Sequence, residues 1–590
     1  MKDILLITAV FILSLFLQSS SPGPSTPGDP DPPEPQSNLD HATMVADRQV
    51  ATMVADWQLA NPNPASKGDW VPEPFLNGMM APGRIPGQDT ARRISRQNRV
   101  IDNPVFVFNN AFNTRGIPFS EIAELLDRLG YDGIEHRDIK GIFELKQELD
   151  RKGLKIFTDY TGIDIDKDPP YLEEWKEVIP RLEGTGLILW VHTHSKCYEP
   201  SDTAADKLLV PIIRELADFA RPYGIRIATY PHANNLVETA EDSYRIARKA
   251  NRENVGAVFN LVHFLLADEE DRLEEVIEKV TPCLFAVSLS GAEKGDYASM
   301  HMNQVIQPLG QGNYDVYRVL ELLLDQGYEG PIGFQCFMIP GEPSEFLHTS
   351  METWKEFKAI YESGANRLTR EEKAEGWKLL FDGYSSKGWR GITKISFPAK
   401  GWEILSGDIR IDARDGAESG NGGDVITVEE YGPDFELKWE WKMLTKGGNS
   451  GVKYFVKEEL TTNGSYGYGL EYQILDDMNH PWMIEGKMKP NDFHTVGALY
   501  EFFAPSEERE VKPLGEWNSS RIVSRENHVE HWLNGRKILE YERGGRKFNK
   551  MLKKSKFREV ENFGAEEKGH ILLQDHGSKV HYRNIKIREL

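Results

Sequence analysis

Eight strand-and-helix units follow one another between Asn103 and Ser363, and this repeat constrains the fold more than any other feature of the 590-residue chain. The units recur at a spacing of roughly 30 residues, which is typical of a (β/α)8 barrel. Amphipathic helices are expected between the strands, for example over Phe119–Leu129 and Lys207–Tyr223. The expected strands are Val105–Phe108, Gly133–His136, Lys155–Asp159, Leu187–His192, Arg226–Tyr230, Gly256–Leu261, Leu284–Leu289 and Ile332–Cys336. We therefore predict a TIM barrel over residues 101–363.

Polar residues stand at the carboxyl ends of these strands, where such barrels place their active sites. A lone histidine at a strand end is more often a hydrogen-bonded structural residue than a catalyst. Several candidates that converge on one barrel mouth nevertheless favour a real site. His192 and His194 also share one side of a strand, a spacing that would suit a transition metal. The candidate substrate-binding residues are Glu135, His192, His232, Asn260, His263 and Gln335.

The pattern changes after Trp377, where helical periodicity gives way to short alternating runs separated by Gly- and Asn-rich turns. This pattern predicts an antiparallel β-sandwich over residues 376–590, and Ser363 to Ala374 is the expected hinge. The expected strands include Phe435–Trp441, Gly451–Phe455, Gly469–Leu475, Arg521–Val523, His531–Leu533, Ile571–Gln574 and Val580–Ile587.

The formal net charge of −22 narrows the range of partners. Nucleic acid and anionic membrane surfaces are disfavoured, because phosphate binding needs a cationic face. A neutral ligand such as a carbohydrate fits the composition better.

The N-terminal region predicts export. Lys2 precedes Ile4 to Leu17, an apolar run of 14 residues that is short for a membrane-spanning helix. We expect a signal peptide over residues 1–20, a periplasmic or extracellular location and no stable membrane span, with an uncleaved anchor as the alternative. Seven prolines between Ser21 and Gln36 predict an extended linker over residues 21–40.

Residues 41–100 are expected to be helical or irregular. Within them, Ala55-Asp56-Trp57-Gln58-Leu59-Ala60-Asn61 and Asp69-Trp70 resemble the opening helices of unsaturated rhamnogalacturonyl hydrolases. About one helical hairpin of that helical barrel is present, so the resemblance implies a glycoside hydrolase fragment without activity of its own.

Four motifs of the barrel region resemble the xylose-isomerase-like sugar phosphate isomerase/epimerase superfamily. They are Tyr230-Pro231-His232, Asn260-Leu261-Val262-His263, Ser288-Leu289-Ser290-Gly291-Ala292-Glu293 and Gly333-Phe334-Gln335. The resemblance implies a divalent metal held by acidic residues on strands five, six and eight and by a histidine on strand seven. Such a metal polarises a carbonyl or enediolate.

The residues at these metal positions depart from the superfamily's pattern, because they are Tyr230, Asn260, Ser288 and Gln335. Amide oxygens are weak neutral ligands for a hard dication. We therefore predict no metal ligands, and a divalent cation stays an open alternative. The resemblance implies that His232 and His263 contact substrate. Together with Glu135, His192 and His194 they would suit metal-free acid–base chemistry.

A longer series of motifs covers the C-terminal domain, which resembles the 3-keto-disaccharide hydrolase family. The motifs are Gly376–Gly383, Gly388-Trp389, Phe435–Trp441, Gly448–Val452, Gly469–Asp477, Gly497–Tyr500, Glu516–Asn518, Trp532–Gly535 and Gly569–Gly577. The resemblance implies a concanavalin-like jelly-roll sandwich.

Strand alternation predicts a polar face on one sheet of this sandwich, since every second residue points to the same side. The residues expected there are Asn449, Lys453, Glu471, Gln473, Gln574 and His576. Amides and acids provide the paired donors and acceptors that sugar hydroxyls need. Asn518 is a further substrate-binding candidate.

The resemblance implies cleavage of a glycoside that carries a ketone at C3. The ketone acidifies the proton on C2, a base removes that proton, and the resulting enolate expels the substituent on C1. Water then completes a net hydrolysis. Glu471 or His576 is the candidate base, Lys453 would stabilise the enolate oxygen, and Asp476 or His480 would protonate the leaving oxygen.

These observations predict an exported glycoside or 3-keto-glycoside hydrolase/lyase whose isomerase/epimerase-like barrel acts on or binds the product. One alternative is a sugar isomerase with a non-catalytic carbohydrate-binding sandwich. Another is a glycan-binding protein without catalysis, since sandwich lectins use a similar polar face.

Overall fold

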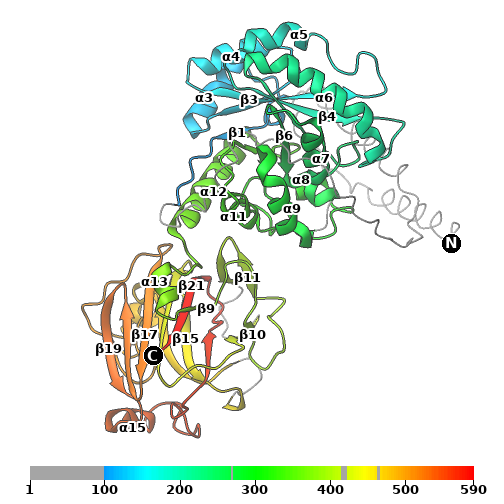
Figure 1. Ribbon diagram of the computed structural model, residues 1–590. Coiled ribbons are helices and arrows are strands. Elements are labelled where there is room, and N and C mark those ends of the chain that lie inside the picture. Colours follow the sequence, from blue (N-terminus) through cyan, green and yellow to red (C-terminus); the bar gives the residue numbers. More distant parts are fainter. Residues whose placement is uncertain (1–98, 114, 268–269, 413–421, 461–465) are drawn as a thin grey trace, which may run out of the picture. The chain divides into compact units, whose positions relative to one another are not determined.

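The computed structural model describes residues 99–590, apart from positions 114, 268–269, 413–421 and 461–465 (Figure 1). The expected signal peptide (1–20), the proline-rich linker (21–40) and the expected hydrolase fragment as far as residue 98 lie outside the described residues. In the part of the chain that is described, no helix combines the length and the apolar character needed to cross a membrane.

Eight parallel strands close into a barrel in the first described part of the chain. The ring closes where the last strand pairs with the first, through Phe106 and Gly333. The strands are β1 (Val105–Val107), β2 (Gly133–Arg137), β3 (Lys155–Asp164), β4 (Ile188–His194), β5 (Arg226–Thr229), β6 (Val255–Asn260), β7 (Leu284–Leu289) and β8 (Ile332–Phe334). The predicted TIM barrel is confirmed.

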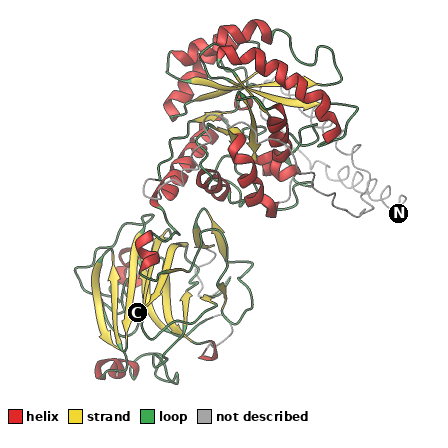
Figure 2. Ribbon diagram, in the orientation of Figure 1, coloured by secondary structure: helices red, strands yellow, loops and turns green. Residues whose placement is uncertain are grey.

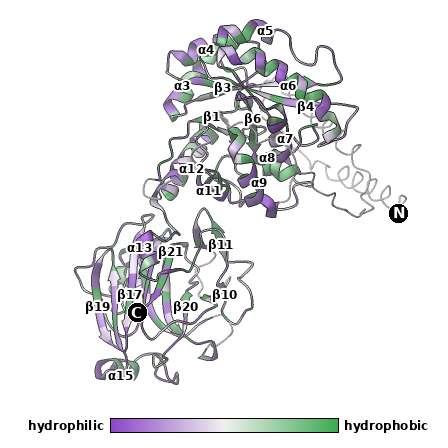
Figure 3. Ribbon diagram, in the orientation of Figure 1, coloured by the Kyte–Doolittle hydropathy of each residue, from purple (hydrophilic) through white to green (hydrophobic). Residues whose placement is uncertain are grey.

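Helices surround these strands (Figure 2) and carry both hydrophilic and hydrophobic residues along their length (Figure 3). The predicted helix Phe119–Leu129 forms with those bounds, and the other predicted helix divides into an α-helix and a 3-10 turn over Arg221–Tyr223. The helices are α3 (Phe119–Leu129), α4 (Ile142–Asp150), α5 (Trp175–Val178), α6 (Asp206–Ala220), α7 (Ala240–Ala250), α8 (Leu261–Ala267), α9 (Leu273–Val280), α10 (Met302–Val305), α11 (Val316–Asp325) and α12 (Pro343–Ser363).

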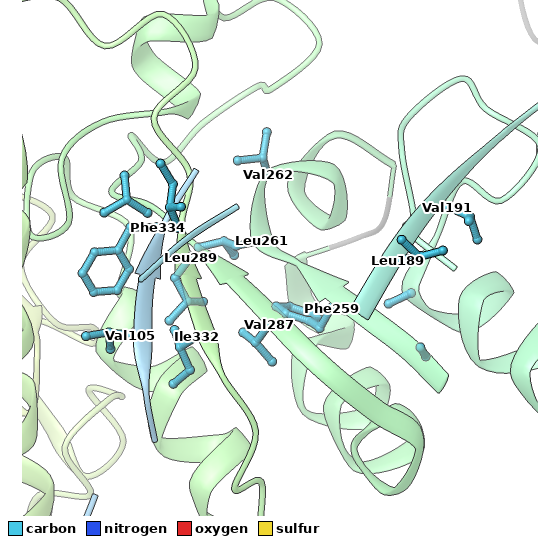
Figure 4. Packing of buried hydrophobic residues seen from close by; sticks show 14 of the residues in the cluster. Val105, Leu189, Val191, Phe259, Leu261, Val262, Val287, Leu289, Ile332 and Phe334 are labelled. Atoms are coloured by element: carbon cyan, nitrogen blue, oxygen red, sulfur yellow. The ribbon is translucent and has the colours of Figure 1, made fainter. Parts of the chain in front are cut away.

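Alternation along the barrel strands separates two cores, because neighbouring residues point to opposite faces of a strand. Leu189 and Val287 belong to the large cluster between strands and helices, part of which is drawn in Figure 4. Trp190 and Ala286, their chain neighbours, belong to a separate cluster inside the barrel. The interior is therefore packed with side chains up to the layer at the carboxyl ends of the strands.

The C-terminal part consists of two antiparallel sheets, as the alternating pattern predicts. The first sheet has the order β10 (Trp389–Gly391), β13 (Val425–Thr427), β20 (His570–Leu573), β15 (Asn449–Val456) and β16 (Leu470–Leu475). The second has the order β11 (Trp402–Leu405), β12 (Asp408–Ile411), β21 (Val580–Glu589), β14 (Phe435–Met443), β17 (Asn518–Arg525), β18 (His528–Leu533) and β19 (Arg536–Glu542), with β9 (Lys378–Leu379) beside β21. Short helices are α13 (Arg370–Ala374), α14 (Pro481–Ile484) and α15 (Arg546–Leu552).

Large aromatic side chains fill the space between the two sheets. Trp439 of β14 meets Tyr472 of β16 edge to face, with ring centroids 5.0 Å apart. Ser450 of β15 and Tyr582 of β21 share a hydrogen bond of 2.6 Å across the core. The residues that alternate with Tyr472 and Ser450 therefore lie on the outer face of the five-stranded sheet.

The interior cluster of the barrel makes a stability prediction. Trp190 is fully buried against Phe106, Phe108 and Tyr230. Trp190→Ala should destabilise the barrel by about 3–5 kcal/mol, because it removes apolar contacts and leaves a cavity. Hydrogen exchange in barrel peptides measures the loss locally, which suits a chain with more than one cooperative unit. The matched change Leu208→Ala on α6, where the side chain is 41% exposed, should cost far less. Equal losses would contradict this account of the interior.

Candidate active site

Glu135 of β2 is a buried carboxyl group at the mouth of the barrel. Its Oε2 accepts a hydrogen bond of 3.0 Å from the backbone N–H of Asn109. Burial raises the pKa of Glu135 to about 8 in spite of that bond, with the charge of Asp159 as a smaller cause. Near neutral pH the side chain is therefore mostly protonated and can donate a hydrogen bond.

Tyr230, Asn260 and Gln335 lie near one another at the same end of the barrel. The Nδ2 of Asn260 donates to the Tyr230 hydroxyl, and its Oδ1 accepts from the backbone N–H of His263 at 3.3 Å. Burial raises the pKa of Tyr230 well above its usual value, and hydrogen bonds with the Asn260 and Gln335 side chains oppose that shift. The three side chains thus form one neutral hydrogen-bonded network.

The amide oxygen of Gln335 has backbone partners as well. Its Oε1 accepts from the N–H groups of Cys336 at 2.9 Å and Phe337 at 3.1 Å, and also from the Asn110 side chain. An oxygen with this many donors has little remaining capacity to ligate a cation.

The residues at the expected metal positions do not fit a divalent cation. Tyr230, Asn260, Ser288 and Gln335 provide no carboxylate and no imidazole, and three of them bond to one another. Within the described residues, three side chains of ligand type come within 4.8 Å of one another at a single place, which is in the sandwich: His528, Glu530 and Glu540. The barrel mouth therefore lacks a ligand set that suits a divalent cation at these four positions.

The histidines of the mouth form two pairs. His192 Nδ1 lies 2.7 Å from His194 Nε2, and the His192 ring stacks on Tyr160 with centroids 4.3 Å apart. The rings of His232 and His263 lie 4.0 Å apart. Burial lowers the pKa of His192 to about 3, with His194 contributing, and it lowers the pKa of the other three as well. Both pairs are neutral at physiological pH.

The polar face of the five-stranded sheet contains five of the six residues expected there. Strand pairing places Lys453 opposite Glu471 and Gly451 opposite Gln473. Asn449 accepts a hydrogen bond of 3.0 Å from the Gln473 Nε2. Gln574 follows β20, and its N–H donates to the carbonyl of Gly451 at 2.9 Å. Neighbouring strands of one sheet therefore bring together Asn449, Lys453, Glu471, Gln473 and, directly after its strand, Gln574.

Lys453 is a buried cation, 1% exposed, beneath a covering loop. Its Nζ donates to the carbonyl of Gly467 at 3.0 Å and lies 4.0 Å from the centre of the Tyr466 ring. The same Nζ lies 3.8 Å from carboxylate oxygens of both Asp424 and Glu471. The ammonium group therefore lies between two acids and is closed to solvent. On an unobstructed concave face it would have been exposed.

Gly451 leaves room for the carboxylate of Glu471. A Cβ atom at position 451 would lie 2.7 Å from Glu471 Oε1, closer than such contacts allow. Glu471 thus leans along the sheet toward the row that contains Gln473. Its backbone carbonyl accepts from the N–H of Tyr500 at 3.1 Å, so the segment after Gly497 extends the sheet beside it.

His480 and His576 lie at the other end of this face. The pKa of His480 is lowered, first by burial and then by the neighbouring His576. The Nδ1 of His480 accepts the backbone N–H of Trp482 at 3.3 Å, so the proton of the neutral ring is on Nε2. The Asp476 carboxylate accepts from the Gly447 N–H and from the Asn479 amide, each at 2.8 Å. Asp476 therefore ties two loops together.

Asn518 lies elsewhere, on β17 of the second sheet. Its Oδ1 accepts from the N–H of Lys512 and from the Asn534 side chain, both at 2.9 Å. Asn518 thus holds loops of the second sheet together and does not lie on the polar face that contains Glu471. Conversely, Asp424 and Tyr466 contact Lys453 on this face, and sequence reasoning did not single them out.

Comparisons with known proteins agree with the two folds. A family model described as 3-keto-alpha-glucoside-1,2-lyase-like domain matches residues 376–588, and one described as xylose isomerase-like TIM barrel matches residues 123–357. A 3-keto-disaccharide hydrolase of Bacteroides thetaiotaomicron is 34% identical over 254 residues, which cover 40% of this chain and 85% of that protein. The chain belongs to the 3-keto-disaccharide hydrolase family.

Two further relatives complete the comparison. An inosose isomerase of Bacillus licheniformis is 28% identical over 277 residues, or 43% of this chain and 98% of the relative. A Parabacteroides distasonis protein of known crystal structure is 36% identical, covers 38% of this chain and 99% of its own, and has a TM-score of 0.34. The family member described here is a carbohydrate-active enzyme that combines a hydrolase-type sandwich with an isomerase-like barrel.

Glu135 provides a pH-dependent test of the barrel mouth. At pH values between the unperturbed pKa of 4.5 and the raised pKa of about 8, Glu135 has lost its proton in the unfolded chain but keeps it in the folded barrel. This group therefore makes the barrel less stable as pH rises across that window. Glu135→Gln should remove that contribution, so the variant should gain stability over the native protein from pH 5 to pH 8.5. Hydrogen exchange in barrel peptides measures the free energy of unfolding at each pH, and Glu144→Gln at an exposed position is the control. Parallel pH curves for Glu135→Gln and the native protein would contradict the assignment.

Gly451 provides a steric test of the sandwich face. Gly451→Ala should displace the Glu471 carboxylate and lower turnover of a family substrate by about tenfold or more, because small displacements of catalytic groups are costly. Adding Glu471→Asp shortens that side chain by one methylene and relieves the overlap. The double variant should therefore recover part of the activity relative to Glu471→Asp alone, as a double-mutant cycle measures. Strict additivity of the two losses would show that they do not act through the same contact.

Proposed function

We propose that the sandwich cleaves 3-keto-glycosides by removing the C2 proton and eliminating the substituent on C1. The observation that carries the proposal is the Glu471 carboxylate, which sits over Gly451 on the polar face of a domain in this family. The related Bacteroides protein is named for hydrolysis of a 3-keto-disaccharide.

Glu471 is the proposed base. Lys453 Nζ lies 3.8 Å from this carboxylate and pairs with it, and Asp424 at the same distance keeps that cation in place. Burial of the group limits competing hydration, so the carboxylate can accept a proton from carbon. In this proposal Lys453 acts mainly by pairing with Glu471 and positioning its carboxylate, more than by binding the enolate oxygen directly.

The hydroxyls of the sugar would bind the neighbouring amides. Gln473 donates to Asn449, while its own Oε1 is buried and has no hydrogen-bond partner in the described chain. A buried acceptor of this kind is stabilised when a ligand hydroxyl reaches it. Gln473, Asn449 and Gln574 are therefore the proposed hydroxyl-binding residues beside the reacting carbon atoms.

The leaving oxygen would receive its proton at the other end of the face. His480 carries its proton on Nε2, and His576 is its neighbour. Asp476 holds this loop and is less suited to the role, because its carboxylate already accepts two hydrogen bonds. The bonds to hydrogen on C2 and to oxygen on C1 break, a C1–C2 double bond forms, and the substituent leaves as an alcohol. Water then adds across that double bond, OH to C1 and H to C2, and gives a 3-keto sugar.

Export is part of the proposal. It is supported by Lys2, the apolar run from Ile4 to Leu17 and the proline-rich stretch that follows. Fractionation of cells that express the full chain, with and without residues 1–20, tests this location independently of activity.

Substitution of Glu471 tests the mechanism. Glu471→Gln keeps the shape but removes the base, so cleavage of a 3-keto-glucoside should fall by about 100-fold or more. Exchange of the C2 hydrogen with deuterated solvent, followed by NMR, should fall in parallel. Glu485→Gln, the same chemical change at an exposed residue, should leave both rates unchanged. Undiminished C2 exchange in Glu471→Gln would reject Glu471 as the base.

A further inference from the structure

At the mouth of the barrel, the side chains at the expected metal positions form hydrogen bonds with one another. Asn260 donates to the Tyr230 hydroxyl, and the side chain of Gln335 also bonds to Tyr230. Asn260 is the last residue of β6, and Gln335 directly follows β8. The two residues therefore come from the strands on either side of β7. Three neutral side chains therefore satisfy one another where related barrels place charged ligands. A dication would have to break these bonds and would gain no anionic ligand in return.

Beside this network lie two buried hydroxyls, of Ser288 and Ser290, for which the described part of the chain provides no hydrogen-bond partner. Ser288 pairs in register with Asn260, and Ser290 is the second residue beyond it. Ser288 is two residues from Ala286 of the interior cluster and therefore shares its face of β7, so its side chain points into the barrel. Among the described residues neither Oγ atom has a hydrogen-bond partner, although both serines are at most 1% exposed. Buried hydroxyls without partners are unusual and are accounted for by a polar ligand at this position.

The histidines add directed donors and acceptors. The Nδ1 of His232 lies 2.9 Å from the carbonyl of Ala233, so the proton is on Nδ1 and Nε2 is an acceptor. His263 is the opposite case, since its Nδ1 accepts from the N–H of Ala233 at 3.3 Å and its proton is on Nε2. The adjacent rings thus offer one acceptor and one donor, which suits a pair of vicinal hydroxyls.

We propose that the barrel mouth is a metal-independent binding site for a neutral polyhydroxylated ligand of the keto-sugar class. The Tyr230–Asn260–Gln335 network takes the place of a cation beneath the ligand, and Glu135 donates a hydrogen bond to its carbonyl or hydroxyl oxygen. The half-buried ring of Tyr160 provides an aromatic wall. This site is separate from the one proposed in the sandwich, and only the choice of probe below depends on that proposal.

The charges around the mouth favour a neutral ligand over a phosphorylated one. Arg137 lies over the Tyr160 ring, but its Nε is also 4.0 Å from the Asp138 carboxylate. Deeper in the mouth the groups are a carboxyl, amides, hydroxyls and uncharged imidazoles. A phosphate would therefore meet cations that are already paired, Arg137 with Asp138 and Lys167 near His194 with Asp164, whereas sugar hydroxyls would meet matched partners.

Calorimetry of the full chain carrying Glu471→Gln tests the proposal, since this background stops turnover in the sandwich. With 3-keto-glucose as the probe, we expect saturable binding that EDTA leaves unchanged. Tyr230→Phe should weaken it about tenfold, because the ligand loses a hydroxyl of the network. Exposed His348→Ala should have no effect. Binding that Tyr230→Phe leaves unchanged, or no binding at about 10 mM probe, would overturn the proposal.

A titration with Mn²⁺ alone addresses the metal directly. Glu540→Gln is added to remove one ligand of the partly buried His528–Glu530–Glu540 cluster on β18 and β19. We expect no saturable Mn²⁺ site below about 1 mM. One equivalent of Mn²⁺ that is lost on Asn260→Ala, or probe binding that requires Mn²⁺, would overturn the metal-independent assignment. If the native protein did not cleave 3-keto-glucosides but the probe binding and the Mn²⁺ titration gave the expected results, only the function proposed for the sandwich would be rejected.

Discussion

The two-residue alternation of β-strands is the constraint on which both parts of this protein depend. In the barrel it sends Leu189 outward to the helices and Trp190 inward, so the interior is filled below the layer of polar residues. In the sandwich it sends Tyr472 into the core and Glu471 to the opposite face. A slip of one residue in either strand would exchange the two sets, burying these polar side chains in the apolar core.

The two sites solve the problem of buried polar groups in different ways. On the sandwich face, Lys453 lies between the carboxylates of Asp424 and Glu471, so charges are kept and paired. At the barrel mouth, Tyr230, Asn260 and Gln335 are neutral and bond to one another. A buried ionised carboxylate suits a proton abstraction from carbon, whereas a neutral network suits the binding of hydroxyls without strong polarisation.

Much of the fold follows from local sequence patterns. The eight barrel strands form at the predicted positions, and the strand predicted over Leu284–Leu289 has those bounds. The shared face of Lys453, Glu471 and Gln473 also follows from sequence, because alternation along β15 and β16 depends on spacing alone. Sequence reasoning missed Asp424, because an acid after two glycines before a short strand carries no local sign that it will meet a lysine on another strand.

The sequence by itself determined the two folds, the positions of the strands and which residues share a face, since these depend on periodicities of a few residues. Only the tertiary structure decided how those faces are used. It covers Lys453 with Tyr466 and Gly467, seats Glu471 over Gly451, and leaves Asn518 on the other sheet. It also joins Tyr230, which directly follows β5, to Asn260 at the end of the neighbouring strand β6. Such contacts connect residues far apart in the chain, and they depend on loop paths and sheet order that local patterning does not encode.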